Sequence, residues 1–223
     1  FQLYMLAVGL RRFGAIRALA NIDLVPAWAP RLLRLFTFYV PHKFGLPASD
    51  GERLALALAS MGPAYIKLGQ TLATRPDLVG RPLAEGLTTL QDRLPPFKFA
   101  KARATIEAEF GGVLEDHFQA FEEVPVAAAS IAQVHKAVTE KGVPVVVKVL
   151  RPDIESRFVR DLKLFDWLAA LAERNVKEAR RLRLSKIVDK VKETSLREMD
   201  LRLEAAAAAE LAENMRGESG YRL

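Results

Sequence analysis

The sequence predicts an α+β fold, in which a mostly helical N-terminal part precedes a small antiparallel sheet with long helices. Residues 1–122 carry apolar residues at helical spacing between Gly and Pro breaks. Residues 129–150 are rich in β-formers and contain a Glu-Lys-Gly turn, which is typical of a hairpin. Residues 151–173 and 185–215 return to helical spacing. We therefore divide the chain at residue 122, into a helical extension (1–122) and a sheet-containing lobe (123–223).

Local signals place several helix ends. Ser49 and Glu52 have capping-box spacing before an apolar helical pattern. The Gly-Pro pair at 62–63 ends that helix and starts the next, with proline in the tolerated first turn. Further helices are expected at 81–92 and 98–110, closed by breaks at Pro95-Pro96 and Gly111-Gly112.

The composition excludes several kinds of site. The chain of 223 residues has no cysteine, which rules out disulfides, thiolate metal sites and cysteine nucleophiles. Its three histidines, His42, His117 and His135, are far apart in the sequence and give little support for a zinc site. We therefore predict no metal site within these residues.

The net charge of +6 is concentrated near the N-terminus, where arginines alternate with aromatic residues and leucines. No run there reaches the roughly 20 apolar residues that span a bilayer. Two interpretations remain open: helices that lie in a membrane interface with their arginines at anionic headgroups, or helices packed on the rest of the protein with solvated arginines. No nucleic-acid recognition module is visible, so no nucleic-acid partner is predicted. Residues 1–50 hold Arg11, Arg12, Arg17, Arg31, Arg34 and Lys43 against Asp23 and Asp50.

Lys148 is the first candidate for chemistry. A lysine after three valines is ordinarily a strand residue with its ammonium in water. Lys148 also lies one hairpin after an alanine-rich loop, the position at which a kinase N-lobe places its phosphate-contacting lysine. Such a lysine needs an acidic partner on a following helix. Glu204 is the candidate, and we expect it to share a helical face with Asp200 on one helix running from Ser185 to about Met215.

Four motifs in order resemble the UbiB family of atypical kinase-like proteins, also called the aarF-domain (ADCK) family, over nearly the whole chain. The family's Lys-x-Gly-Gln motif is met by Lys67, Gly69 and Gln70, and its Thr-Arg-Pro-Asp-Leu continuation by residues 74–78. Its alanine-rich loop is met by Ala127, Ala128, Ala129 and Ser130, its lobe lysine by Lys148, and its Glu-x-Asp motif by Glu198 and Asp200, with Glu204 following.

The resemblance implies a protein-kinase-like N-lobe preceded by a helical extension, with the C-terminal lobe absent from this chain. It implies ATP or ADP with Mg²⁺ as cofactor and places the metal ligands beyond Leu223, because the chain contains no catalytic-loop or metal-binding Asp motif. Lys148 would hold the α/β-phosphates and Glu204 would position Lys148. The nucleotide-binding set is Ala127, Ala128, Ala129, Ser130, Gln133, Val134 and Lys148, and the set that gates the cleft is Lys67, Gly69, Gln70, Glu198 and Asp200.

Glu198 and Asp200 are about 200° apart on an ideal helix, so they cannot point the same way. One is expected to meet Lys67 across the cleft while the other supports a neighbouring element. Alanines in place of glycines narrow the backbone choices of the loop and should hold a nucleotide in a different pose.

The resemblance therefore implies an atypical kinase or ATPase that supports ubiquinone biosynthesis from the cytoplasmic side of a bacterial inner membrane. Its expected partners are a nucleotide, a membrane surface or an isoprenoid or quinone lipid, and other ubiquinone biosynthesis proteins. The alternative is a non-catalytic lipid- or partner-binding module. An ordinary protein kinase is disfavoured by the alanine loop and by the helix that would occupy its substrate groove.

Overall fold

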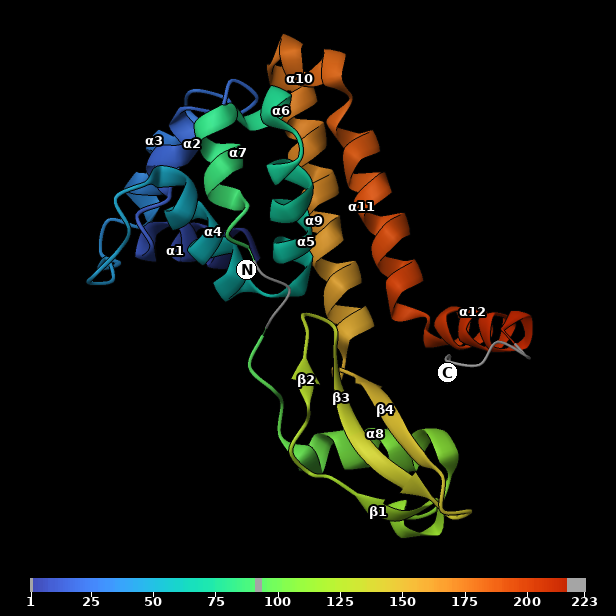
Figure 1. The fold of residues 1–223 in the computed structure, drawn as a ribbon. Coiled ribbons are helices and arrows are strands. Elements are labelled where there is room, and N and C mark those ends of the chain that lie inside the picture. The colour runs from blue at the N-terminus through green and yellow to red at the C-terminus, as the bar shows by residue number, and fades with distance from the viewer. Residues whose placement is uncertain (1, 91–93, 216–223) are drawn as a thin grey trace.

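The computed structural model describes residues 2–90 and 94–215, and it confirms the α+β fold (Figure 1). A block of helices holds the N-terminal residues and the long helices that follow the sheet, and the sheet with one helix lies beside that block. The helices are α1 (Gln2–Arg12), α2 (Ile16–Ala20), α3 (Ala29–Phe36), α4 (Asp50–Met61), α5 (Pro63–Ala73), α6 (Pro76–Val79), α7 (Arg81–Leu87), α8 (Phe99–Phe110), η1 (Leu114–Asp116, 3₁₀), α9 (Ile154–Asn175), α10 (Lys177–Leu182), α11 (Leu184–Met199) and α12 (Leu201–Asn214). The strands are β1 (Phe118–Phe121), β2 (Ala127–Ala128), β3 (Ala132–Thr139) and β4 (Pro144–Leu150).

Strand β3 is the centre of the antiparallel sheet. It pairs with β4 along its whole length, so that Val134 lies opposite Lys148. On the other edge, β1 pairs with one end of β3 and β2 with the other. Because side chains alternate between the two faces of a strand, Val134, Val146 and Lys148 project from one face and Val147 and Val149 from the other.

The two faces of the sheet have different surroundings. Helix α8 packs on the face of Val149, and a small apolar core forms there from Ala102, Ile106, Leu114, Phe118, Ala137 and Val149. The opposite face is open at Val146, whose surface is 68% exposed. A half-covered sheet of this kind accounts for the alternating pattern of the hairpin, and it leaves one face available to a ligand.

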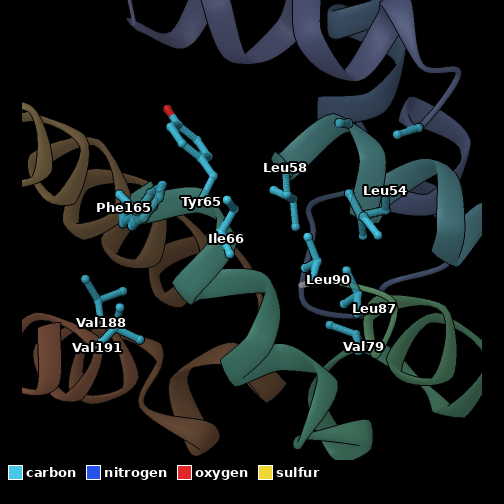
Figure 2. Packing of buried hydrophobic residues seen from close by; sticks show 14 of the residues in the cluster. Leu54, Leu58, Tyr65, Ile66, Val79, Leu87, Leu90, Phe165, Val188 and Val191 are labelled. Carbon is cyan, nitrogen blue, oxygen red and sulfur yellow. The ribbon is translucent and has the colours of Figure 1, made fainter. Parts of the chain in front are cut away.

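A second and larger core fills the helical block (Figure 2). Helix α5 lies at its centre, between α4 and α7 on one side and α9 and α11 on the other. Tyr65 of α5 meets Phe165 of α9 edge to face, with ring centroids 5.0 Å apart. Burial, followed by the charge of Asp161, raises the pKa of Tyr65 to about 12. The helix that carries Lys67 is therefore fixed on both sides by apolar packing.

Helices α4 and α7 approach each other through two glycines. A Cβ atom at Gly86 would lie 2.5 Å from the backbone Cα and C of Gly51, and a Cβ at Gly51 would lie 2.9 Å from the Cα of Gly86. Real Cβ atoms do not come this near to backbone. The crossing therefore requires glycine at both positions.

Several predicted elements agree with the structure. Ser49 caps α4, with its Oγ accepting a hydrogen bond from the backbone N–H of Glu52 (3.4 Å). Helix α5 begins at Pro63, and α8 covers nearly all of the predicted 98–110. The hairpin expected at 129–150 is formed by β3 and β4.

Three expectations were wrong. Residues 118–121, assigned to the helical part, form strand β1, which pairs with β3 and contributes Phe118 to the small core. Helix α7 ends at Leu87, whereas a helix was expected at 81–92, and residues 91–92 lie outside the described residues. The single helix expected from Ser185 to about Met215 is two helices, because the chain turns at Asp200 and α12 leaves the direction of α11 (Figure 1).

Among residues 2–90 and 94–215, no helix has the length and apolar character needed to cross a bilayer. Large aromatic side chains nevertheless stand exposed near the N-terminus, including Phe36, Phe38, Tyr39 and Phe44.

Candidate nucleotide pocket

A pocket of ≈ 280 Å³ lies where the sheet meets the helical block. Its walls come from five places in the chain: α5, the β2–β3 turn with the start of β3, strand β4, the end of α11, and the start of α12. The pocket is therefore formed only when both parts of the chain are assembled. Its lining residues are Lys67, Ala129, Ser130, Ile131, Ala132, Lys148, Glu198 and Glu204.

The alanine-rich loop is a tight turn between β2 and β3. The N–H of Ala129 donates to the carbonyl of Ala132 (2.8 Å), and Ser130 is buried. Neither Ala129 nor Ser130 has a positive φ angle. The turn therefore uses backbone conformations that any L-residue can adopt, so alanine suffices here and no glycine is needed.

Arg151, which the sequence reasoning missed, holds this turn in place. Its Nε and Nη2 donate to the carbonyl of Ala129 (3.1 and 2.9 Å), and Nη2 also donates to the carbonyl of Pro95 (2.9 Å). The guanidinium lies over the ring of Phe97, 5.6 Å from its centroid. Burial lowers the pKa of Arg151. A signal existed in the sequence, since Arg151 directly follows β4 and precedes a proline, but nothing in that pattern says what its side chain contacts.

Lys148 and Glu204 form an ion pair at the mouth of the pocket, with Nζ and Oε2 2.5 Å apart. The two side chains are 36% and 60% exposed. An exposed pair of this kind adds only about 0.2–1 kcal/mol to stability. The pair therefore adds little to the stability of the fold, and its main effect is to orient the ammonium of Lys148.

Lys67 and Glu198 form a second pair across the pocket, with Nζ and Oε2 2.7 Å apart. The Lys67 side chain is 16% exposed, so this pair is better shielded from water than the first. Gly69, two residues later on α5, is packed so closely that a Cβ there would overlap the side chains of Leu58 and Leu90. The glycine of the Lys-x-Gly-Gln motif thus allows α5 to sit deep enough for Lys67 to reach Glu198.

Other predicted site residues lie elsewhere. The amide of Gln133 is fully buried on the covered side of the sheet, where Oε1 accepts from the N–H of Phe97 (2.9 Å) and Nε2 lies 2.8 Å from Nε2 of His135.

Asp200 caps α12 by accepting from the N–H of Arg202 (3.2 Å), and hydrogen bonds from the side chain of Arg202 lower the pKa of Asp200. Gln70 is half-buried on α5 and does not line the pocket. The expectation that Asp200 and Glu204 share one helical face is wrong, because Asp200 stands before the first turn of α12.

The open face of the hairpin borders the pocket. Val134 lies opposite Lys148, and Val146 lies two residues before it on the same face. Ala127 of β2 lies opposite Val134 on that strand's other side. Together they give an apolar surface next to a lysine, which suits a planar base whose phosphates point to the ammonium. Among the described residues no three His, Asp or Glu side chains are grouped so as to hold a metal ion.

A small antiparallel sheet whose strand lysine pairs with a helix glutamate beneath a tight turn defines a kinase-like N-lobe. A family model described as the ABC1 atypical kinase-like domain matches residues 89–223. The chain belongs to this family, and the predicted resemblance is confirmed.

Curated relatives support the same assignment. The chain is 45% identical over 201 residues to the "Probable protein kinase UbiB" of Aeromonas hydrophila subsp. hydrophila, covering 87% of this chain and 36% of that protein. It is 44% identical over 197 residues to the protein of the same name from Shewanella loihica, covering 86% of this chain and 36% of that protein. Among solved structures it resembles the complex of Rv3197 with erythromycin from Mycobacterium tuberculosis, at 31% identity and a TM-score of 0.42, over 73% of this chain and 41% of that one. The chain thus spans about a third of the length of these curated relatives.

Proposed function

We propose that this chain is the nucleotide-binding part of a UbiB-like atypical kinase or ATPase, and that it binds ATP or ADP in the pocket of Lys148. The observation that carries the proposal is the Lys148–Glu204 pair, which lies against the turn of Ala129 and Ser130. Lys67 brings a second cation to the same pocket. Two ammonium groups beside a tight backbone turn suit a polyphosphate chain.

Each residue has a distinct part in this proposal. Lys148 holds the α/β-phosphates, and Glu204 keeps its ammonium directed to them. Val134 and Val146 offer the apolar surface for the base. The Lys67–Glu198 pair joins α5 to α11 across the pocket, so its opening or closing would decide whether the phosphates can enter.

Mg²⁺ would supply charge neutralisation between the phosphate oxygens, and its ligands are proposed to lie beyond Leu223. Lys67 and Lys148 fit the phosphates that such an ion accompanies, whereas Glu198 and Glu204 are each already engaged with a lysine. The wider role, support of ubiquinone biosynthesis at the cytoplasmic side of a bacterial inner membrane, is proposed from the similarity to the UbiB proteins.

Substitution of Lys148 tests the proposal directly. Lys148→Ala is expected to weaken ADP binding by on the order of 10- to 100-fold, because a charge-assisted contact to phosphate is lost. The measurement is calorimetric titration of ADP with Mg²⁺ into the 223-residue chain. Lys136→Ala is the matched control, since Lys136 projects from the same face of the hairpin on β3 but does not line the pocket. Equal affinities for wild type and Lys148→Ala contradict the proposal.

A second candidate function, binding of a membrane lipid, is favoured by an apolar cavity. A cavity of ≈ 430 Å³ lies between the N-terminal helices and α5, α9 and α11, and its lining is almost wholly apolar. Tyr65, Leu68 and Leu72 of α5 form part of its wall, so the helix of Lys67 is shared by this cavity and the nucleotide pocket. A lipid in the cavity would contact α5 and could thereby shift the position of Lys67 in the nucleotide pocket.

Flotation with liposomes tests the lipid candidate. Deleting the N-terminal helices is unsuitable, because α1, α2 and the turn between them supply Leu10, Phe13 and Ile16 to the larger core. A Phe36→Ser/Phe38→Ser/Phe44→Ser variant removes three largely exposed aromatic side chains, of which Phe36 also lines the cavity, and is expected to abolish flotation. Phe110→Ser, at an exposed position on α8, serves as the control and should float like wild type. If the triple variant floats as well as wild type, the lipid-binding candidate is contradicted.

A further inference from the structure

A second polar pocket, separate from the nucleotide pocket, gathers the positive charge of the N-terminal helices. It has a volume of ≈ 500 Å³ and is formed by the ends of α1 and α2, by α3, by the segment that follows α3, and by α4. None of its lining residues is acidic. They are Arg11, Gly14, Ile16, Arg17, Arg34, His42, Lys43, Leu46 and Arg53.

Within the described part of the chain, no carboxylate pairs with the cations of this pocket. Across residues 2–90 and 94–215, no ion pair joins any of the five Arg and Lys side chains to a carboxylate. Arg53 donates from Nε to the carbonyl of Pro47 (2.6 Å), and the ammonium of Lys43 lies 4.3 Å from the ring centroid of Phe13. These contacts fix two of the side chains and leave their charge in place.

Arg11 carries a polar atom that lacks a partner. Its Nε is buried and forms no hydrogen bond, the only such side-chain nitrogen or oxygen in the part of the chain that the structure describes. A buried donor without an acceptor is costly, and in native proteins such a donor is rare unless water, an ion or a ligand supplies the acceptor. The orphaned donor and the uncompensated charge lie in the same pocket.

The electrostatic field in the pocket is consistent with this description. The pKa of His42 is lowered, first by burial and then by the charges of Arg11, Arg53 and Arg17. Arg34 and Lys43 also face the same space. The cations around His42 repel one another, and a bound anion would relieve that repulsion.

We propose that this pocket binds a phosphoryl anion of about diphosphate size, either free or as the headgroup of a lipid. Arginine forks match phosphate oxygens in a bidentate manner, and four arginines with one lysine suit an anion that carries several charges. The volume of the pocket admits such a group. The exposed aromatics of α3 and the following segment, Phe36, Phe38 and Phe44, neighbour it in sequence and provide the apolar surface that a lipid source would also need. The inference does not depend on nucleotide binding at Lys148.

The test uses two arms and two charge-matched variants of the 223-residue chain. Inorganic pyrophosphate is titrated calorimetrically, in a Lys148→Ala background that weakens competing binding in the nucleotide pocket. Flotation compares vesicles of phosphatidylcholine with vesicles that also contain phosphatidic acid. The pocket variant is Arg17→Gln/Arg34→Gln, whose side chains are exposed, so that the fold is not at risk. The control is Arg12→Gln/Arg31→Gln, with the same loss of charge at exposed positions that do not line the pocket.

The pocket variant is expected to bind at least about tenfold more weakly than the control, because each lost arginine removes a charge-assisted hydrogen bond to phosphate. If pyrophosphate binds and the pocket variant loses it, the anion is free phosphate. If only phosphatidic acid vesicles are bound and the pocket variant alone releases them, the anion is a headgroup. Both results support the pocket.

Equal behaviour of the two variants, or no binding in either arm, overturns the inference. A further readout is the NMR titration of His42, whose pKa is expected to rise when pyrophosphate is added. This rise requires the anion to sit among Arg11, Arg17 and Arg53, so binding elsewhere on the chain would leave the His42 titration unchanged.

Discussion

Gly86→Ala is expected to lower the free energy of unfolding by about 2–3 kcal/mol, a large effect for a single methyl group. The added Cβ would meet the backbone of Gly51 and Glu52, which cannot rotate away as a side chain can. Helices α4 and α7 must then separate, and Leu54 and Leu87, which share the larger core, lose contact with their neighbours. Alanine favours helix over glycine by up to about 1 kcal/mol, so the steric cost has to exceed this gain.

The measurement is urea denaturation followed by circular dichroism. Gly9→Ala is the matched control, because Gly9 also lies within a helix and a Cβ there would meet only the flexible side chain of Met61. The control is expected to stay within about 1 kcal/mol of wild type, as helix propensity offsets a small adjustment of Met61. If Gly86→Ala is as stable as the control, α4 and α7 do not approach each other as closely at Gly51 and Gly86 as the structure shows.

Arg151→Met is expected to reduce stability by about 1.5–3 kcal/mol and to weaken ADP binding severalfold. The stability loss follows from the carbonyls of Ala129 and Pro95, which each lose a charged donor, and from the ring of Phe97, which loses the guanidinium that lies over it. The affinity loss follows from the turn, since Ala129 and Ser130 line the nucleotide pocket and Arg151 keeps that turn against the segment before α8.

Both quantities are measured on the same preparations, by urea denaturation and by ADP titration at a temperature where each variant is folded. Arg157→Met is the control, at an exposed position on α9, and should change neither value. A loss of stability with unchanged ADP affinity in Arg151→Met limits Arg151 to a structural role. Unchanged stability contradicts the assigned hydrogen bonds altogether.

The hairpin and its lysine could be predicted because the information is local. Alternating apolar residues with a Lys-Gly turn define β3 and β4, and their register places Lys148 on the open face. The family motifs predicted a Lys148–Glu204 pair and a contact of Lys67 with either Glu198 or Asp200, and the structure contains the pairs Lys148–Glu204 and Lys67–Glu198. The functional roles assigned to these residues, and the division of the chain at residue 122, stay predictions.

Features that depend on distant contacts could not be predicted. Strand β1 is only four residues long and becomes a strand by pairing with β3, not by its own propensity. The helix break at Asp200 lies in a sequence whose neighbours all favour helix. The only local signal is Asp200 itself, which caps α12 by accepting a hydrogen bond from the N–H of Arg202. Gln133 looked available to a nucleotide, yet its amide satisfies the backbone of Phe97, a residue 36 positions away.

Helix α12 has a thermodynamic consequence for the pocket. None of its described residues is buried, and Leu203 and Leu211 stand exposed on its surface. A helix of 14 residues that buries no side chain is only marginally folded in water, even with a run of five alanines. In the 223-residue chain the helix–coil equilibrium of α12 therefore affects the fraction of molecules in which Glu204 is near Lys148, and the proposed nucleotide affinity would fall in proportion to that fraction. Under the same proposal, a partner or chain segment that covers α12 would raise the nucleotide affinity of the pocket without contacting the nucleotide.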